Sequence, residues 1–196
     1  TTTPLYLVVP PGVPYSRSSS APLLSQKRGW SNPGMDIPWR RDFKSGYEWR
    51  KDHFTRLKIV DLDAGFDIKV PWELSRFHQA VSLGQCYALT GKSVYVTEFM
   101  AQLHDWWVEN PCEFGPNWAN AMEVSVRAVN LIWSYELMRA APLLDNQFRL
   151  SLLRSLLQHG RYIMRHLESG WPGSNHFVAD LCGLIWLGIY LWPAPE

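Results

Sequence analysis

Apolar residues recur every three or four positions through most of the chain beyond residue 58, which is the spacing of one face of an α-helix. Glycine, proline and capping residues divide this pattern into segments. The segments predict five helices: Glu73–Thr90, Ser93–Asn110, Asn117–Ala140, Asp145–Ser169 and Asn175–Leu191. A strand is allowed at Leu57–Asp61, but the pattern as a whole predicts an all-α fold.

The first four predicted helices make two successive hairpins, and the fifth begins a third pair. Such a series grows as an open solenoid or closes into an α/α toroid. The fifth helix is apolar on every face from Leu181 to Leu191, so we expect other protein to surround it. We therefore predict that residues 47–196 are an incomplete (α/α) toroid. Through helix 175–191 it would pack against a further part of the same protein or against another chain.

Residues 1–46 are rich in proline, serine and glycine, and we predict an extended arm that lies over the rest of the molecule. Basic residues crowd together beyond Trp39: Arg40, Arg41, Lys44, Arg50, Lys51, Arg56 and Lys58, with Asp42, Glu48 and Asp52 among them. This patch is either a site for an anionic ligand or an ordinary solvated surface.

The composition limits the classes of function. With 196 residues, 46% of them hydrophobic, the chain can bury a substantial core. A net charge of +1 gives no reason to expect nucleic acid or a membrane surface as a partner. The apolar run Leu181–Trp192 is shorter than the roughly 20 residues of a membrane span. The cysteines form no CxxC pair and the histidines no HExxH motif, so we predict no metal and no cofactor.

The chain has 11 tryptophans. Core packing is expected to account for most of them, because an indole buries a large apolar area once its N–H finds an acceptor. Two or three are expected to face a ligand, since the flat indole also stacks on sugar rings.

A polar stripe follows one face of the third predicted helix: Asn120, Glu123, Arg127, Asn130 and Ser134. Met122, Val126, Val129 and Trp133 mark its apolar side. Glu123 and Arg127 are four positions apart and can form an ion pair. The stripe is either a solvent-exposed face or the lining of a cleft, and the apolar character of the rest of the helix favours the cleft.

Asn175 and His176 stand at the start of the fifth predicted helix. Free backbone N–H groups and the helix dipole favour a negatively charged ligand at such a position. The alternative for Asn175 is simple helix capping, and the alternative for His176 is a structural histidine at the edge of the core.

Several separated motifs occur in one order: Asp67–Arg76, Asp105-Trp106-Trp107 with Asn110-Pro111, Gly115–Trp118, Ala121-Met122-Glu123 with Arg127, and Ser174-Asn175-His176 with Asp180. Over roughly residues 60–190 the sequence resembles the heparinase II/III and alginate-lyase superfamily, whose N-terminal α/α toroid carries these motifs. It departs at Leu131, where many relatives have tryptophan, and at Ser174, where some have a second asparagine. The resemblance implies that further helices and a C-terminal β-sandwich follow.

The resemblance also implies a function, the cleavage of a uronic-acid-containing polysaccharide by β-elimination in the periplasm or outside the cell. Asn175 and His176 would neutralise the sugar carboxylate. The cleft would be lined by residues that bind the glycan: Trp72, Arg76, Trp118, Glu123 and Arg127. In relatives a later tyrosine and histidine act as general acid and base, so we expect this chain to be inactive alone.

Two other functions stay open. One is a non-catalytic glycan-binding or helical scaffold module that uses the same cleft. The other is a glycosidase, which needs two positioned carboxylates, with Glu123 and Asp180 as the candidates. Arg127 beside Glu123 argues against the glycosidase, because it would keep that carboxylate ionised.

Overall fold

The computed structural model describes residues 37–59, 61, 63–170 and 174–192, which are mainly helical. Their elements are η1 (Phe54–Arg56), α2 (Lys69–Ser75), α3 (His78–Thr90), α4 (Val94–Glu109), η2 (Pro116–Trp118), α5 (Ala121–Met138), α6 (Asn146–Arg165) and α7 (Asn175–Leu191). Within these residues β-type pairing is limited to two isolated bridges. The all-α prediction is confirmed, and the strand that the pattern allows at Leu57–Asp61 does not form at its described positions.

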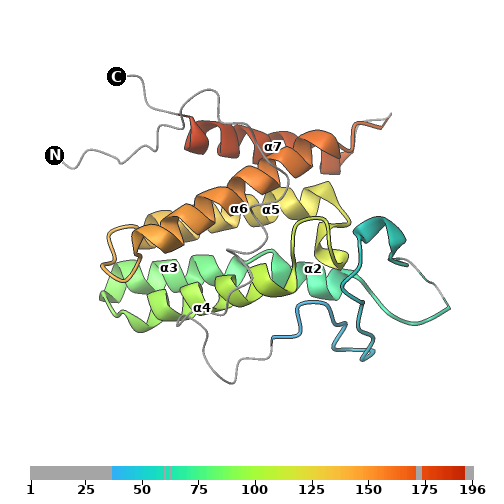
Figure 1. Ribbon diagram of the computed structural model, residues 1–196, viewed down its shortest axis with the longest axis horizontal. Helices are drawn as coiled ribbons and strands as arrows, with labels where there is room; N and C mark the ends of the chain where they lie inside the picture. Colours follow the sequence, from blue (N-terminus) through green and yellow to red (C-terminus); the bar gives the residue numbers. More distant parts are fainter. Residues whose placement is uncertain (1–36, 60, 62, 171–173, 193–196) are drawn as a thin grey trace.

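The helices pack as successive hairpins in layers (Figure 1). Helix α3 pairs with α4, α5 pairs with α6, and α7 lies against both α5 and α6. Helix α5 is central, because α3 and α7 pack on its two sides. Helices α4 and α6 also meet, where Trp107 Nε1 donates to Ser155 Oγ at 3.0 Å. The two predicted hairpins are present, and closure into a toroid stays a prediction.

The prediction of one helix from Glu73 to Thr90 is wrong, because the chain forms two helices, α2 and α3. The break lies at Phe77, which has a left-handed φ of 61°. This conformation costs about 1–3 kcal/mol in a residue other than glycine. The side chain of Phe77 is fully buried, with the Trp39 ring stacked at 5.4 Å and the Trp106 ring edge-on at 5.9 Å. Packing therefore stabilises a break that no glycine or proline marks.

Helix starts follow hydrogen bonds that the sequence only partly indicates. The predicted cap of the third helix, Asn117, lies instead in η2, and α5 is capped by Asn120, whose Oδ1 accepts from Glu123 N at 3.2 Å. Asp145 caps α6 as predicted, with Phe148 N at 2.7 Å, but that helix ends at Arg165 rather than near Ser169. Helix α7 has the predicted bounds.

The polar stripe of α5 faces the core. Glu123 and Arg127 are each 1% exposed and Ser134 is fully buried, so the solvent-exposed interpretation of the stripe is wrong for these residues. The residues expected on the apolar side, Met122, Val126, Val129 and Trp133, are half-buried or exposed. Polar side chains are usually exposed and apolar ones buried. On α5 this preference is reversed because hydrogen bonds to residues of other segments satisfy the buried polar groups.

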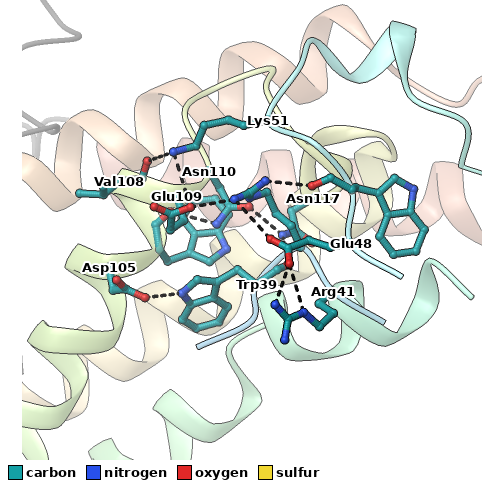
Figure 2. Close-up of polar contacts among 12 residues, drawn as sticks. Trp39, Arg41, Glu48, Lys51, Asp105, Val108, Glu109, Asn110 and Asn117 are labelled. Carbon is teal, nitrogen blue, oxygen red and sulfur yellow. Dashed lines mark hydrogen bonds and ion pairs between the residues drawn. The ribbon is translucent and has the colours of Figure 1, made fainter. Parts of the chain in front are cut away.

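The described start of the chain packs against α4. Figure 2 shows Trp39 and Lys51 reaching this helix, where Trp39 Nε1 donates to Asp105 Oδ2 at 2.7 Å and Lys51 Nζ donates to Val108 O at 2.8 Å. Trp39 of the predicted arm is thus part of the packed core. Residues 1–36 lie outside the described residues, as do Trp171-Pro172-Gly173 and Pro193.

Candidate functional site

The sequence-predicted site residues come from three segments that meet at one end of the molecule (Figure 1). Helix α2 carries Trp72 and is followed by Arg76, η2 and the first turns of α5 carry three more, and α7 begins with Asn175 and His176. Helix α2 packs against both η2 and α5, and α5 packs against α7. The N-terminal end of α5 is therefore the centre of the candidate site.

Arg76 and Glu123 form a paired, bidentate contact across this end. Arg76 Nε and Nη2 each donate to a Glu123 oxygen at 2.7 Å, and Nη1 donates to Glu73. Hydrogen bonding to Glu123 raises the pKa of Arg76 above its ordinary value. The Arg76 side chain is 22% exposed while its Glu123 partner is buried, so Arg76 is the member that a ligand can reach.

Arg127 lies deeper than Arg76. Its guanidinium stands 4.5 Å from the Trp106 ring centre and 5.2 Å from that of Trp118. Its Nε donates to His159 Nε2 at 2.9 Å and its Nη2 to Asn117 O at 3.1 Å. The predicted ion pair between Glu123 and Arg127 is therefore wrong, since Glu123 pairs with Arg76. Burial lowers the pKa of Arg127, and the Glu123 charge opposes this effect.

The two predicted tryptophans differ in exposure. Trp72 is half-buried and donates Nε1–H to Pro116 O at 2.8 Å. Trp118 is fully buried and donates to Asn110 O at 3.1 Å. Direct contact of a glycan with Trp118, Glu123 or Arg127 stays a prediction. In this structure all three contact other protein groups.

His176 belongs to a small polar cluster with Glu168 and Asn120. His176 Nδ1 lies 3.2 Å from Glu168 Oε2, 3.3 Å from Oε1 and 3.5 Å from Asn120 Nδ2. Asn120 Nδ2 also donates to Glu168 Oε1 at 2.9 Å. Since the Asn120 Oδ1 caps α5 at Glu123, one line of hydrogen bonds connects His176 to the Arg76–Glu123 pair.

Asn175 is exposed at the first position of α7, and the helix cap is its neighbour Ser174, whose Oγ accepts from Phe177 N at 3.4 Å. Asn175 therefore does not serve as the cap, which was the structural alternative for it. Among the described residues no hydrogen bond holds its side chain amide. The structure brings Asn175 beside His176 but does not connect it to the other predicted residues.

Asp180 anchors the cluster from α7 and is fully buried. Its Oδ2 accepts from the Glu168 backbone N–H at 3.0 Å, and its Oδ1 accepts from Ser125 Oγ at 3.4 Å. Burial raises the pKa of the Asp180 carboxyl above its ordinary value, and the Glu168 charge acts in the same direction.

Glu168 is the member of this cluster that sequence reasoning missed. The helical pattern placed it in the last turn of a helix running to Ser169, whereas α6 ends at Arg165. Glu168 and His176 are separated by the break between α6 and α7, so no helical periodicity relates them. No local signal could have paired the two.

The basic stretch lies apart from this cluster. A cavity of about 300 Å³ is lined by Tyr47, Glu48, Trp49, Arg50, Arg56, Leu57 and Lys58. Its cations have carboxylate partners: Arg50 and Arg56 pair with Asp52, and Lys58 pairs with Asp61. None of the predicted site residues lines this cavity, and its balanced charges fit a solvated surface better than an anion site.

No group of three or more metal-binding side chains occurs among the described residues. The same part of the chain contains no helix long and apolar enough to cross a membrane.

Comparison with known protein families identifies the family of this chain. The family model described as Heparinase II/III N-terminus matches residues 25–195, nearly the whole chain, which confirms the resemblance to heparinase II/III proteins. No curated protein and no solved structure matches the chain.

Proposed function

Because the chain belongs to the heparinase II/III N-terminus family, we propose that it supplies the carboxylate-binding part of a polysaccharide lyase acting on uronic-acid-containing glycans. The observation that carries the proposal is the hydrogen-bonded line from Arg76 through Glu123, Asn120 and Glu168 to His176, which joins separate segments at one end of the molecule. The exposed members of this end present a cation, an imidazole and an amide.

The proposed reaction is β-elimination. A base removes the proton from C5 of the uronate, the C4–O bond breaks, a C4=C5 double bond forms, and the leaving oxygen takes a proton. Negative charge grows on the C6 carboxylate as the C5 proton leaves, so donors fixed around that carboxylate stabilise the transition state. Asn175, His176 and the free N–H groups at the start of α7 suit this task.

The proton-transfer groups are proposed to come from outside this chain. Tyr162 is buried and its hydroxyl donates to Trp118 O, so it is committed to a structural hydrogen bond. Burial raises the pKa of both Tyr162 and Tyr190 above the ordinary tyrosine value, which disfavours the phenolate that a general base requires.

The direct test mixes the purified chain with alginate, heparan sulfate and hyaluronan. Calorimetry measures binding, and ultraviolet absorbance of the conjugated double bond measures elimination. We expect binding of at least one polymer and no turnover. Substitutions Asn175→Ala and His176→Ala should weaken binding, while Gln147→Ala, at the exposed start of α6, should not. Robust turnover by the chain alone would show that the proton-transfer groups are already present.

A non-catalytic glycan-binding module is the second candidate. It is favoured by the burial of Glu123, Arg127 and Trp118, which leaves Trp72 and Arg76 as the reachable side chains of the predicted cleft. Under this candidate binding survives Asn175→Ala unchanged and falls with Arg76→Ala.

A glycosidase receives no support from the carboxylates. Glu123 is held by Arg76, and Asp180 is buried and accepts two hydrogen bonds. Neither is placed as a free acid or nucleophile.

We also propose a periplasmic or secreted location, since large uronate polymers are found outside the cytoplasm. Fractionation of the native host with an antibody to this chain tests it. Recovery in the cytoplasm alone would contradict it.

A further inference from the structure

We propose that Glu168 is a positioning residue for His176: its carboxylate holds the Nδ1–H of the imidazole and leaves Nε2 as the nitrogen that meets a ligand. The inference rests on the proposed function, in which His176 binds the substrate carboxylate. It adds a residue and a defined tautomer to that site.

The hydrogen on Nδ1 follows from the chemistry of the partners. Both oxygens of Glu168 lie within hydrogen-bond distance of Nδ1, at 3.2 and 3.3 Å. A carboxylate accepts hydrogen bonds and donates none, so Nδ1 must carry the hydrogen. Asn120 Nδ2, at 3.5 Å, is itself a donor and offers Nδ1–H no acceptor. The tautomer of a histidine is set by the partner of one ring nitrogen, which frees the other for function.

Glu168 is itself fixed from two sides. Its backbone N–H donates to the buried Asp180, at 3.0 Å, and its side chain accepts from Asn120 Nδ2 at 2.9 Å. The amide of Asn120 cannot flip without losing its cap, because its Oδ1 accepts from Glu123 N. The carboxylate is thus held between the start of α5 and the start of α7.

The pair is held and yet accessible. The side chain of His176 is 38% exposed and that of Glu168 is 30% exposed. Among the described residues no hydrogen bond occupies His176 Nε2. In a ring that carries both protons, Nδ1–H stays on Glu168 and Nε2–H is available to a uronate carboxylate. Such outer partners orient a functional imidazole in the way that they orient metal-bound histidines.

Long-range proton–nitrogen NMR of the ¹⁵N-labelled chain tests the proposal without any glycan. The His176 resonances are identified by their loss in His176→Gln. At a pH that leaves the ring neutral, we expect a pyrrole-type Nδ1 and a pyridine-type Nε2. A neutral ring with its proton on Nε2 in the unmodified chain would overturn the proposal.

Two variants distinguish a positioning role of Glu168 from a purely structural role. Glu168→Ala should shift the neutral ring away from the Nδ1–H tautomer. It should also weaken binding of an alginate oligosaccharide about tenfold, which corresponds to about 1.4 kcal/mol. Glu168→Gln should keep the tautomer, because its amide oxygen still accepts from Nδ1–H. If the His176 tautomer is unchanged in a folded Glu168→Ala protein, Glu168 does not position the ring.

The two proposals fail in different ways. If no uronate polymer binds the chain, the proposed function fails, while the tautomer still decides the role of Glu168. If binding depends on His176 but not on Glu168, the function stands and the positioning role is lost.

Discussion

Two basic side chains, Arg127 and His159, share a hydrogen bond inside the core. Arg127 donates to His159 Nε2 at 2.9 Å, and His159 Nδ1 lies 2.7 Å from the Ser155 carbonyl oxygen, to which it donates. With one nitrogen accepting and the other donating, His159 is neutral in the folded protein. Burial, together with the Arg127 charge, lowers the pKa of His159 to about 3.

His159 should make the protein sensitive to acid. The unfolded chain takes up a proton near pH 6.5, whereas the folded protein resists it down to about pH 3, so unfolding is increasingly favoured as pH falls through this window. The free energy of unfolding should fall by up to about 1.4 kcal/mol for each pH unit within this window. Urea unfolding from pH 8 to pH 4 measures it. His159→Gln keeps an acceptor for Arg127 and should flatten the profile.

The matched control is His78→Gln, at an exposed histidine on α3. Its pH profile should stay parallel to that of the unmodified protein. Equal slopes for His159→Gln and the unmodified protein would show that His159 does not carry the acid sensitivity.

Glu123 makes Arg76 important for stability as well as for the proposed site. Arg76→Ala leaves a buried carboxylate without its bidentate partner, which costs about 3 kcal/mol or more in a fully buried pair. Because Arg76 is partly exposed, water can reach the gap, and we expect about 2 kcal/mol from urea unfolding. Arg139→Ala removes an exposed pair with Glu136 and should cost less than about 1 kcal/mol. Equal losses in the two variants would contradict the burial argument.

The tryptophans show how well the type of a residue predicts whether it is buried. The prediction that most are core residues holds for Trp39, Trp49, Trp106, Trp107 and Trp118, which are buried with their N–H groups hydrogen-bonded. The sequence could not name the acceptors, because they lie between 8 and 66 positions away along the chain. The same limit explains why Arg76 and Glu123 were both named as site residues while Glu123 was paired with Arg127.

At the scale of elements, α5 and α7 approach closely where Gly183 faces Ser125. A Cβ on Gly183 would lie 2.6 Å from the Ser125 Cβ and 3.0 Å from its Cα. Ser125 cannot easily yield, since its hydroxyl holds the buried Asp180.

Gly183→Ala should therefore separate the two helices and cost about 1–3 kcal/mol in urea or thermal unfolding. Gly188 in the same helix has open space around its Cα, so Gly188→Ala should stabilise by about 0.5–1 kcal/mol. A loss of stability in Gly183→Ala and a gain in Gly188→Ala, on the same helix, would separate the effect of the contact with Ser125 from the effect of helix propensity. A neutral Gly183→Ala would mean that α7 packs less closely than described.

Helix prediction succeeded where periodicity and caps agree and failed where tertiary contacts decide. The bounds of α7 and the Asp145 cap of α6 follow from the sequence. The Phe77 break does not, because a left-handed phenylalanine is favoured only by the aromatic rings that bury it.

At the scale of the whole molecule, α7 has an apolar face that no other described element covers. Its exposed residues are Val178, Leu181, Ile185, Trp186, Ile189 and Trp192. A contiguous apolar face of this kind marks an interaction surface or an aggregation risk.

We expect the purified chain to self-associate through this face in a concentration-dependent way. Replacing Ile185 and Ile189, which are 61% and 71% exposed, by glutamate should shift sedimentation toward the monomer with little change in melting temperature. Leu89→Glu alters a residue that is 85% exposed on α3 and should leave association unchanged. Equal association of the double variant and the unmodified chain would place the contact elsewhere.

The sequence by itself determined the helical class, the hairpin order, the family and the segments that carry the candidate site, because periodicity, caps and ordered motifs are local properties of the chain. Only the tertiary structure decided the partners: Arg76 for Glu123, His159 for Arg127, and Glu168 for His176. Each of these contacts joins residues from different segments, and their choice depends on which buried charges and donors the packed helices leave to be satisfied.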